Sequence, residues 1–161
     1  MLSGETTIGK YPVKCIEVFD RIARRIERSG GANFFEHSDL TTSRQKLVKS
    51  AVVMANELRA EAILVITRTG NMARYVGWLR PRHSKIYALC PGDGVAGGLT
   101  LSWGVTPFVV PFDLINPENT IEAALKSLKE QGRLKTGATA VIVGSILVGE
   151  QIVDAVQMRV V

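Results

Sequence analysis

AILVITRTGNMAR (62–74) is the stretch that decides the fold. Its first five residues form an uninterrupted apolar run, partly β-branched, which is typical of a strand buried on both faces of a sheet. A polar turn containing Gly70 follows, and the pattern after it predicts a helix through about Leu79. A buried strand that leads directly into a helix is the repeating unit of a parallel sheet covered by helices.

The same alternation continues to the end of the chain. Four further strands are predicted, at IYALC (86–90), VTPFVV (105–110), TAVIVGSI (139–146) and VDAVQMRVV (153–161). Between them we predict a short glycine-rich helix ending near Trp103 and a longer helix from Pro117 to Gln131. The last link is too short for a crossover helix, so the fifth strand should run antiparallel at an edge. The predicted fold class is α/β, a three-layer α/β/α domain with a five-stranded mixed sheet.

A separate segment precedes this domain. Apolar residues at helical spacing predict an amphipathic helix from about Tyr11 to Arg28, which Ser29-Gly30-Gly31 ends. The next residues carry no clear period, and Thr42 or Ser43 is suited to cap the following helix. The predicted organisation is an N-terminal segment at 1–29, a linker at 30–42 and a domain at 43–161.

Composition limits the classes of function. The chain has 161 residues, enough for one domain with an appendage, and 46% hydrophobic residues, enough for a core. Its longest apolar runs are far below the roughly 20 residues of a membrane span, so we expect a soluble, cytoplasmic protein with no membrane partner. Cys15 and Cys90 show no CxxC spacing, and histidines do not cluster. We therefore expect two buried thiols and no metal site.

The net charge of +5 is unevenly placed. Residues 62–92 contain no Asp or Glu, but they contain Arg68, Arg74, Arg80, Arg82 and Lys85. Such a zone can attract a phosphate-bearing small molecule, although a solvated surface is the simpler explanation from charge alone. Nucleic acid is not expected as a partner, because the chain has no long Lys/Arg run and no aromatic-interleaved basic patch.

Two turns after predicted strands could hold an anion. TRTGNMAR (67–74) offers the hydroxyls of Thr67 and Thr69 and the unpaired N–H groups of a helix start, although an ordinary helix cap explains the same residues. PGDGVAGG (91–98) contains G-x-G-x-x-G at Gly92, Gly94 and Gly97, and Asp113 follows at the end of the next strand. This resembles a dinucleotide fingerprint with its ribose-binding acid, but close packing of a glycine-rich loop is the simpler explanation.

Three stretches carry a resemblance to the pyruvate kinase family. MLSGETTIGKYPVKCIEVFDRIARRIE (1–27) closely resembles the segment that ends the family's (β/α)8 barrel, with S-G-E-T and Y-P at the same spacing. SAVVMANELRAEAILVITRTGNMARYVGWLRPRHSKIYAL (50–89) and WGVTPFVV (103–110) are similar to its C-terminal domain. The chain therefore looks like a carboxy-terminal fragment: a barrel-derived helix followed by the regulatory and assembly domain.

The resemblance implies what the whole enzyme does. It would transfer a phosphoryl group from phosphoenolpyruvate to ADP with Mg²⁺ and usually K⁺, in a cytoplasmic homotetramer. The missing barrel carries that chemistry, so this chain alone should be inactive and hold no cofactor. Ser3 and Glu5 take the family positions that border the active site, and they would act only with the full barrel.

The resemblance also assigns the turn after residue 66. It matches the family's effector-phosphate loop, which implies phosphate binding by a run of six residues: Thr67, Arg68, Thr69, Gly70, Asn71 and Met72. Met72 departs from the family, which commonly has a hydroxyl there. ILVGEQIVDAV (146–156) replaces the P-G-x-T-N-T loop of fructose-bisphosphate-regulated members, and Glu150 adds a carboxylate. A nucleotide or sugar monophosphate is thus the favoured effector.

Three functions remain open at this stage. The first is a regulatory and assembly domain that binds a phosphorylated effector. The second keeps self-association, through the edge strand at 153–161, but has lost the effector site. The third is a small dinucleotide-dependent enzyme using Gly92, Gly94, Gly97 and Asp113, and the S-G-E-T and Y-P match weighs against it.

Overall fold

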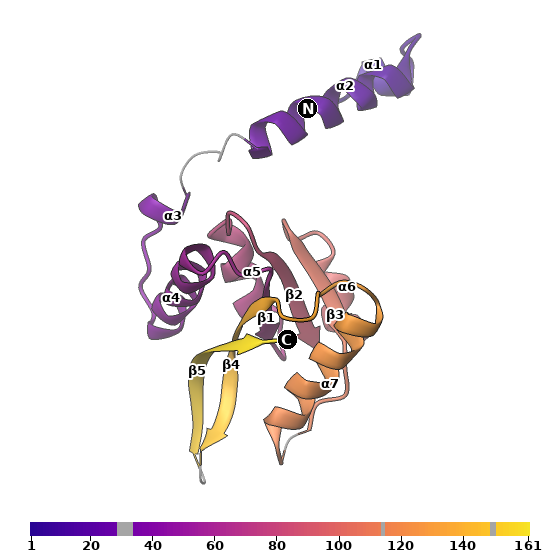
Figure 1. The fold of residues 1–161 in the computed structure, drawn as a ribbon. Coiled ribbons are helices and arrows are strands. Elements are labelled where there is room, and N and C mark those ends of the chain that lie inside the picture. Colours follow the sequence, from indigo (N-terminus) through magenta and orange to yellow (C-terminus); the bar gives the residue numbers. More distant parts are fainter. Residues whose placement is uncertain (29–33, 114, 149–150) are drawn as a thin grey trace. The chain divides into compact units, whose positions relative to one another are not determined.

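The computed structural model describes residues 1–28, 34–113, 115–148 and 151–161. These residues divide into two compact units, Met1–Glu36 and His37–Val161. The first unit contains helices α1 (Gly4–Thr7) and α2 (Pro12–Arg28), and a one-turn helix α3 (Phe34–His37) spans the boundary (Figure 1). The helix α3 falls within the stretch where the sequence shows no period. The predicted linker residues 30–33 lie outside the described part.

Helix α2 is amphipathic, as predicted, and begins at Pro12 because proline is suited to the first helical position. It has no buried residue, and its apolar side chains remain 43–68% exposed. These side chains are Val13, Ile16, Val18, Phe19, Ile22 and Ile26. Cys15 is only half-buried here, so the expectation of a buried thiol is wrong for Cys15 and confirmed for Cys90.

The second unit is built on one five-stranded sheet in the order β3-β2-β1-β4-β5. Its strands are β1 (Ala62–Ile66), β2 (Lys85–Cys90), β3 (Val105–Val109), β4 (Thr139–Val148) and β5 (Gln151–Val160). The first four strands run parallel and β5 is antiparallel to β4 at an edge, which confirms the predicted mixed sheet. Strands β4 and β5, which form the last hairpin, are both longer than predicted.

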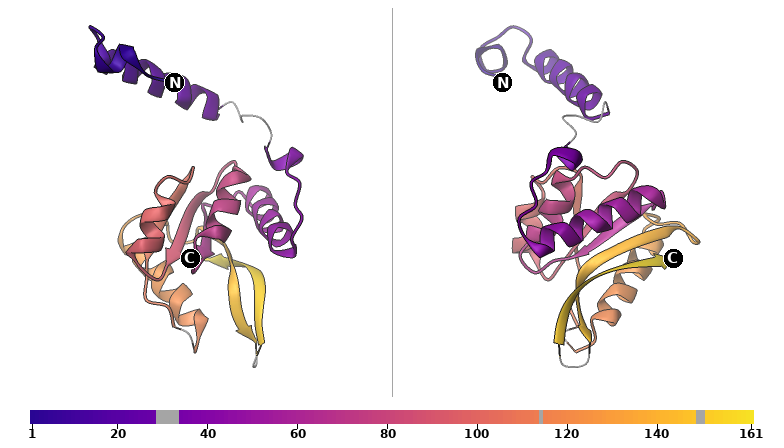
Figure 2. Two further views of the ribbon diagram at one scale, coloured as in Figure 1. Left: turned by 180° about the vertical axis from the view of Figure 1, so that it is seen from behind. Right: turned by 90° about the vertical axis from the view of Figure 1, so that its left-hand side faces the viewer.

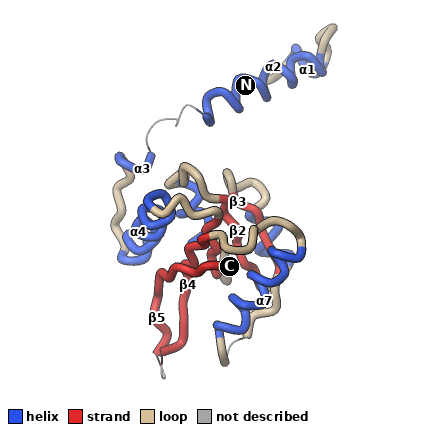
Figure 3. Tube along the Cα trace, in the orientation of Figure 1, coloured by secondary structure: helices blue, strands red, loops and turns tan. Residues whose placement is uncertain are grey.

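Helices cover both faces of this sheet, as the sequence predicts (Figure 2). Helix α7 (Pro117–Glu130) packs on the face formed by Leu64, Leu89 and Ile142. Helices α4 (Ser43–Glu57) and α5 (Asn71–Trp78) pack on the other face, because β1–α5–β2 and β3–α7–β4 cross over in opposite directions. Helix α6 (Asp93–Leu99) contacts β2 and β3, and short loops join these elements (Figure 3).

The strand order reverses between β1 and β4. The chain moves from β1 outward to β2 and β3, and then returns to add β4 on the other side of β1. In open parallel sheets the loops diverge at such a switch point, and they leave a crevice at the carboxyl ends of the strands. The fold alone therefore points to the carboxyl ends of β1 and β4 as a place for a ligand.

Candidate functional site

A pocket of about 240 Å³ lies at this switch point. Its walls come from the turn after β1, the end of β4, the first turn of α4 and the segment between β3 and α7. The lining residues are Arg44, Ile66, Thr67, Arg68, Thr69, Asn71, Met72, Phe112, Asp113, Pro117, Thr120, Ser145 and Ile146. Of the six residues predicted to bind a phosphate, five line this pocket, and the sixth, Gly70, lies between them.

The turn after β1 is held rigidly by Thr67 and Gly70. Thr67 is 4% exposed, its N–H donates to the carbonyl of Leu89, and its hydroxyl oxygen accepts the N–H of Gly70 at 2.9 Å. Gly70 has φ +84°, a left-handed conformation that favours glycine. Because a threonine hydroxyl can donate as well as accept, the Thr67 proton is left for another acceptor at the pocket wall.

Helix α5 begins directly at the pocket without a side-chain cap. The first N–H groups of a helix have no partner within the helix, and they carry the positive end of its dipole. The side chains of Thr42 and Asn116 satisfy such groups in α4 and α7, but Gly70 at the N-cap of α5 has none to offer. The N–H groups at the start of α5 are therefore suited to an anion.

Arg44 and Ser145 bring further polar groups from distant parts of the chain. The Nε and Nη2 atoms of Arg44 donate to the two carboxylate oxygens of Asp154, at 2.9 and 3.3 Å. The Ser145 hydroxyl donates to the same carboxylate at 2.7 Å. The hydrogen bond from Arg44, aided by that from Ser145, lowers the pKa of Asp154, and the same contact raises the pKa of Arg44.

Asp113 lines the pocket but serves the start of α7. Its carboxylate accepts the N–H groups of Ile115 and Asn116 and the side-chain amide of Asn119, at 2.7–2.9 Å. These bonds, that from Asn116 first, lower the pKa of Asp113. The Asp113 carboxylate therefore stays ionised and is already occupied by three donors.

The dinucleotide interpretation gains no support from this arrangement. Gly92, Gly94 and Gly97 do not line the pocket that contains Asp113. The third glycine of such a fingerprint normally allows close packing between helix and strand, yet a Cβ on Gly97 would meet nothing within 4 Å. The carboxylate proposed for a ribose is engaged by α7, as described above.

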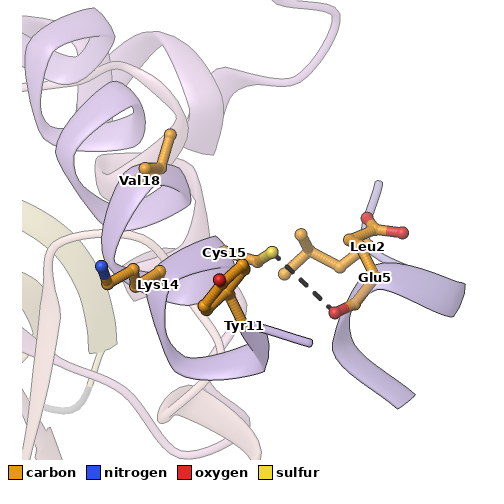
Figure 4. A pocket seen from close by; sticks show the side chains of 6 residues that line it. All are labelled: Leu2, Glu5, Tyr11, Lys14, Cys15 and Val18. Carbon is orange, nitrogen blue, oxygen red and sulfur yellow. Dashed lines mark hydrogen bonds between the residues drawn. The ribbon is translucent and has the colours of Figure 1, made fainter. Parts of the chain in front are cut away.

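Ser3 and Glu5 lie together in the other unit, at the start of α1. The Ser3 hydroxyl donates to the Glu5 carboxylate at 3.3 Å, and backbone N–H groups, that of Glu5 first, lower the pKa of Glu5. Glu5 also lines an open hollow, mostly apolar, between α1 and α2, where the Cys15 thiol points to the Glu5 carbonyl oxygen (Figure 4). Its other walls are Leu2, Tyr11, Lys14 and Val18.

Two classes of site are not found among the described residues. No group of three or more His, Cys, Asp or Glu side chains gathers there in a way that could hold a metal ion. In the same part of the chain, no helix combines the length and the apolar character that crossing a bilayer requires. Glu150, whose carboxylate the family resemblance implies near the effector sugar, lies outside the described residues.

Sequence reasoning missed the residues that reach the pocket from a distance. The signal for Ser145 was present, because polar residues at the carboxyl ends of neighbouring parallel strands meet at one edge. Arg44 gives no such signal. It lies in the first turn of α4, and only the tertiary packing of α4 beside β4 and β5 brings it to the pocket.

Comparisons with known proteins agree on one family. The sequence profile of "Pyruvate kinase, alpha/beta domain" matches residues 45–157. The chain is 37% identical to pyruvate kinase 2 of Synechocystis sp. over 150 residues, which cover 92% of this chain and 25% of that protein. It is 30% identical to a pyruvate kinase of Staphylococcus epidermidis over 160 residues, 94% of this chain and 26% of that one.

A solved structure extends the agreement to three dimensions. The crystal structure of a pyruvate kinase from Cryptosporidium parvum matches with a TM-score of 0.74 and 27% identity, covering 98% of this chain and 32% of that one. The chain thus spans about a quarter of the length of the curated relatives described here. With its sheet topology and the matched profile, it belongs to the pyruvate kinase family and carries that family's α/β domain.

Proposed function

We propose that the unit His37–Val161 is the regulatory and assembly domain of a pyruvate kinase and binds a phosphorylated effector in the pocket at the switch point. The observation that carries the proposal is the uncapped start of α5 opening into this pocket beside Thr67 and Thr69. A longer protein with a catalytic barrel would convert phosphoenolpyruvate and ADP to pyruvate and ATP. Mg²⁺ and K⁺ would belong to that barrel, and the present chain alone would be inactive.

In this proposal each part of the pocket has a separate task. The N–H groups at the start of α5 and the hydroxyls of Thr67 and Thr69 would hold the phosphate oxygens. Arg68 is exposed at the rim, where its charge would attract the dianion and form a charge-assisted hydrogen bond. Met72, 6% exposed, would contribute an apolar wall in place of a hydroxyl.

The pocket size limits the effector. Sites for larger organic ligands usually measure about 300–1,000 Å³, whereas this pocket is close to 240 Å³. A phosphate and one small sugar fit such a volume better than a bisphosphate does. Asp113 adds a fixed negative charge, which would repel a second phosphate.

Thermal unfolding with a ligand panel tests the proposal. The panel is AMP, ribose 5-phosphate, glucose 6-phosphate, fructose 1,6-bisphosphate, NAD and sulfate. A ligand at 100 times its dissociation constant adds about 2.7 kcal/mol, which raises the melting temperature of a domain this size by roughly 5–11 °C. Thr69→Glu should abolish the shift, because a carboxylate at the start of α5 would repel the phosphate.

A matched control distinguishes an effect of the added carboxylate at the start of α5 from a general effect of added charge. Thr136 is also an exposed turn threonine, but it precedes β4 and so lies at the opposite edge of the sheet. Thr136→Glu should leave the ligand-induced shift unchanged. If the shift survives Thr69→Glu, the phosphate does not bind at α5.

An assembly domain without an effector is the second candidate. It is favoured by Met72, which removes a hydroxyl from the loop, and by the apolar edge strand β5, where Met158 and Val160 are 49% and 68% exposed. A flat response to the whole panel would leave only this function, with α5 capped by water. A response to NAD alone would contradict both candidates, the effector-binding domain and the assembly domain without an effector.

A further inference from the structure

Arg44 and Ser145 both line the pocket with polar groups, and both donate to a single carboxylate. Asp154 on β5 takes the Nε and Nη2 donors of Arg44 and the hydroxyl of Ser145. Ser145 and Asp154 are directly paired in the register of β4 and β5, so the backbone holds the two side chains together. The Ser145–Asp154 contact is therefore built into the hairpin, and Arg44 joins it from α4.

The geometry of the Arg44–Asp154 contact is that of a guanidinium with an anionic ligand. Two donors of the planar fork meet two oxygens of one acid, and a phosphate would be bound in the same way. Among the described residues, Asp154 is the carboxylate that engages Arg44. Asp113 lines the same pocket, but its oxygens are taken by donors at the start of α7.

The pair also remains open to exchange. The side chains of Arg44 and Asp154 are 56% and 27% exposed, and exposed ion pairs are typically worth only about 0.2–1 kcal/mol. A phosphate dianion carries more charge than a carboxylate and would meet further donors at the start of α5. Arg44 can therefore turn from Asp154 to a ligand at small cost.

We propose that Asp154 is an internal competitor for Arg44: it holds this arginine when no phosphate is bound and must release it when a phosphate binds. This inference rests on the proposed function of the pocket and adds a residue that sets its affinity. Asp154 weakens the binding of any anion that uses Arg44. The pocket therefore fills only at ligand concentrations high enough to displace Asp154 from Arg44.

The test uses the full chain, labelled with ¹⁵N, and inorganic phosphate at constant ionic strength. The amide signals of Thr69 and Gly70 report the dissociation constant, and the Nε–H signal of Arg44 reports its partner. Asp154→Asn keeps the size of the side chain but removes its charge. We expect about two- to fivefold tighter phosphate binding in this variant, which corresponds to the upper part, about 0.4–1 kcal/mol, of the range for an exposed pair.

A double variant shows whether the gain acts through Arg44. In the Arg44→Gln background, Asp154→Asn should change phosphate affinity by less than about 1.5-fold, because no guanidinium is left to release. Glu130→Gln is the matched charge control. It removes one negative charge at the far end of α7, about 20 Å from Pro117 at the pocket, and should leave the affinity unchanged.

Other results would overturn the inference in different ways. Weaker binding in Asp154→Asn would mean that Asp154 positions Arg44 for the ligand, and equal gains with and without Arg44 would mean general repulsion. An unchanged affinity would remove Asp154 from the site while the proposed function stands. Absence of phosphate binding in the natural chain and in every variant would instead refute the proposed function, and this inference with it. Should Asp154→Asn disturb the hairpin, seen as widespread signal changes, Asp154→Ser replaces it.

Discussion

Gly70 is the single residue on which the geometry of the pocket turn most depends. Its φ of +84° lets the chain leave β1 and enter α5 within a few residues, while the Gly70 N–H donates a hydrogen bond to the Thr67 hydroxyl oxygen. Gly70 also packs closely against α6: a Cβ atom added to Gly70 would lie 3.2 Å from Cδ2 of Leu99. Both the backbone and the packing therefore favour glycine here.

Gly70→Ala should lower the free energy of unfolding. A left-handed conformation costs a non-glycine residue about 1–2 kcal/mol, and the contact with Leu99 adds to that cost. Urea unfolding followed by circular dichroism measures the change. Gly94→Ala in α6 is the matched control: its Cβ meets nothing within 4 Å, and it should stabilise by about 0.5–1 kcal/mol. Equal effects at the two glycines would contradict this account of the turn.

At the scale of elements, the contact between β1 and β4 depends on another glycine. Gly144 on β4 lies against Ile66 at the end of β1, and a Cβ at this position would come within 2.7 Å of the Ile66 Cβ. Both strands sit at the centre of the sheet and have little freedom to separate. Ile66 lines the pocket, and so does Ser145, the residue after Gly144. The distance between β1 and β4 at this point therefore also sets the width of the pocket.

Gly144→Ala should destabilise the domain by about 1–3 kcal/mol, the usual cost of overfilling a packed interior. The same variant should weaken any ligand of the pocket, because the strand ends would move apart. Urea unfolding gives the first quantity, and the phosphate titration described above gives the second. Unchanged stability would show that the two strands yield at this point without cost.

Elements were predicted well where apolar periodicity and local caps agree. The buried run at 62–66 and the helix at 117–130 stand close to their predicted bounds, because a strand covered on both faces needs a continuous apolar run. The one-turn helix α3 has too few residues to show a period. The extension of the β4–β5 hairpin beyond the sheet depends on pairing between its own strands, which no residue pattern announced.

The pocket could be only half predicted for a physical reason. The turn at Thr67–Met72 is local, so hydroxyls, a glycine and a helix start can be read from consecutive residues. Arg44 and Asp154 meet across 110 positions of sequence, and their contact exists only once α4 has packed beside β5. Such pairs follow from tertiary structure, which the pattern of a single sequence does not specify.

For the whole molecule, the two units differ in how well they cover their apolar surface. The unit His37–Val161 buries a continuous core on both faces of its sheet, whereas α2 leaves a full stripe exposed. An exposed stripe of this kind usually contacts another protein surface or drives association. In the longer protein that we propose, the barrel would be that surface.

Removal of residues 1–36 should therefore change association without unfolding the domain. The shortened chain should keep a cooperative thermal transition, because its core lies within His37–Val161. Sedimentation at micromolar concentration should show the 161-residue chain as oligomers and the shortened chain at lower mass. A monomeric full chain would show that α2 does not drive association, and loss of the transition would show that the first unit is needed for folding.

The reversal of strand order affects how the domain folds during its synthesis. The central strand β1 pairs with β2 on one side and β4 on the other, and Thr139 begins β4 long after Ile66 has ended β1. A ribosome adding about 5–20 residues per second needs several seconds to make the intervening chain. Throughout that time one edge of β1 lacks its neighbour, so the nascent domain must wait for its last hairpin before the sheet can close.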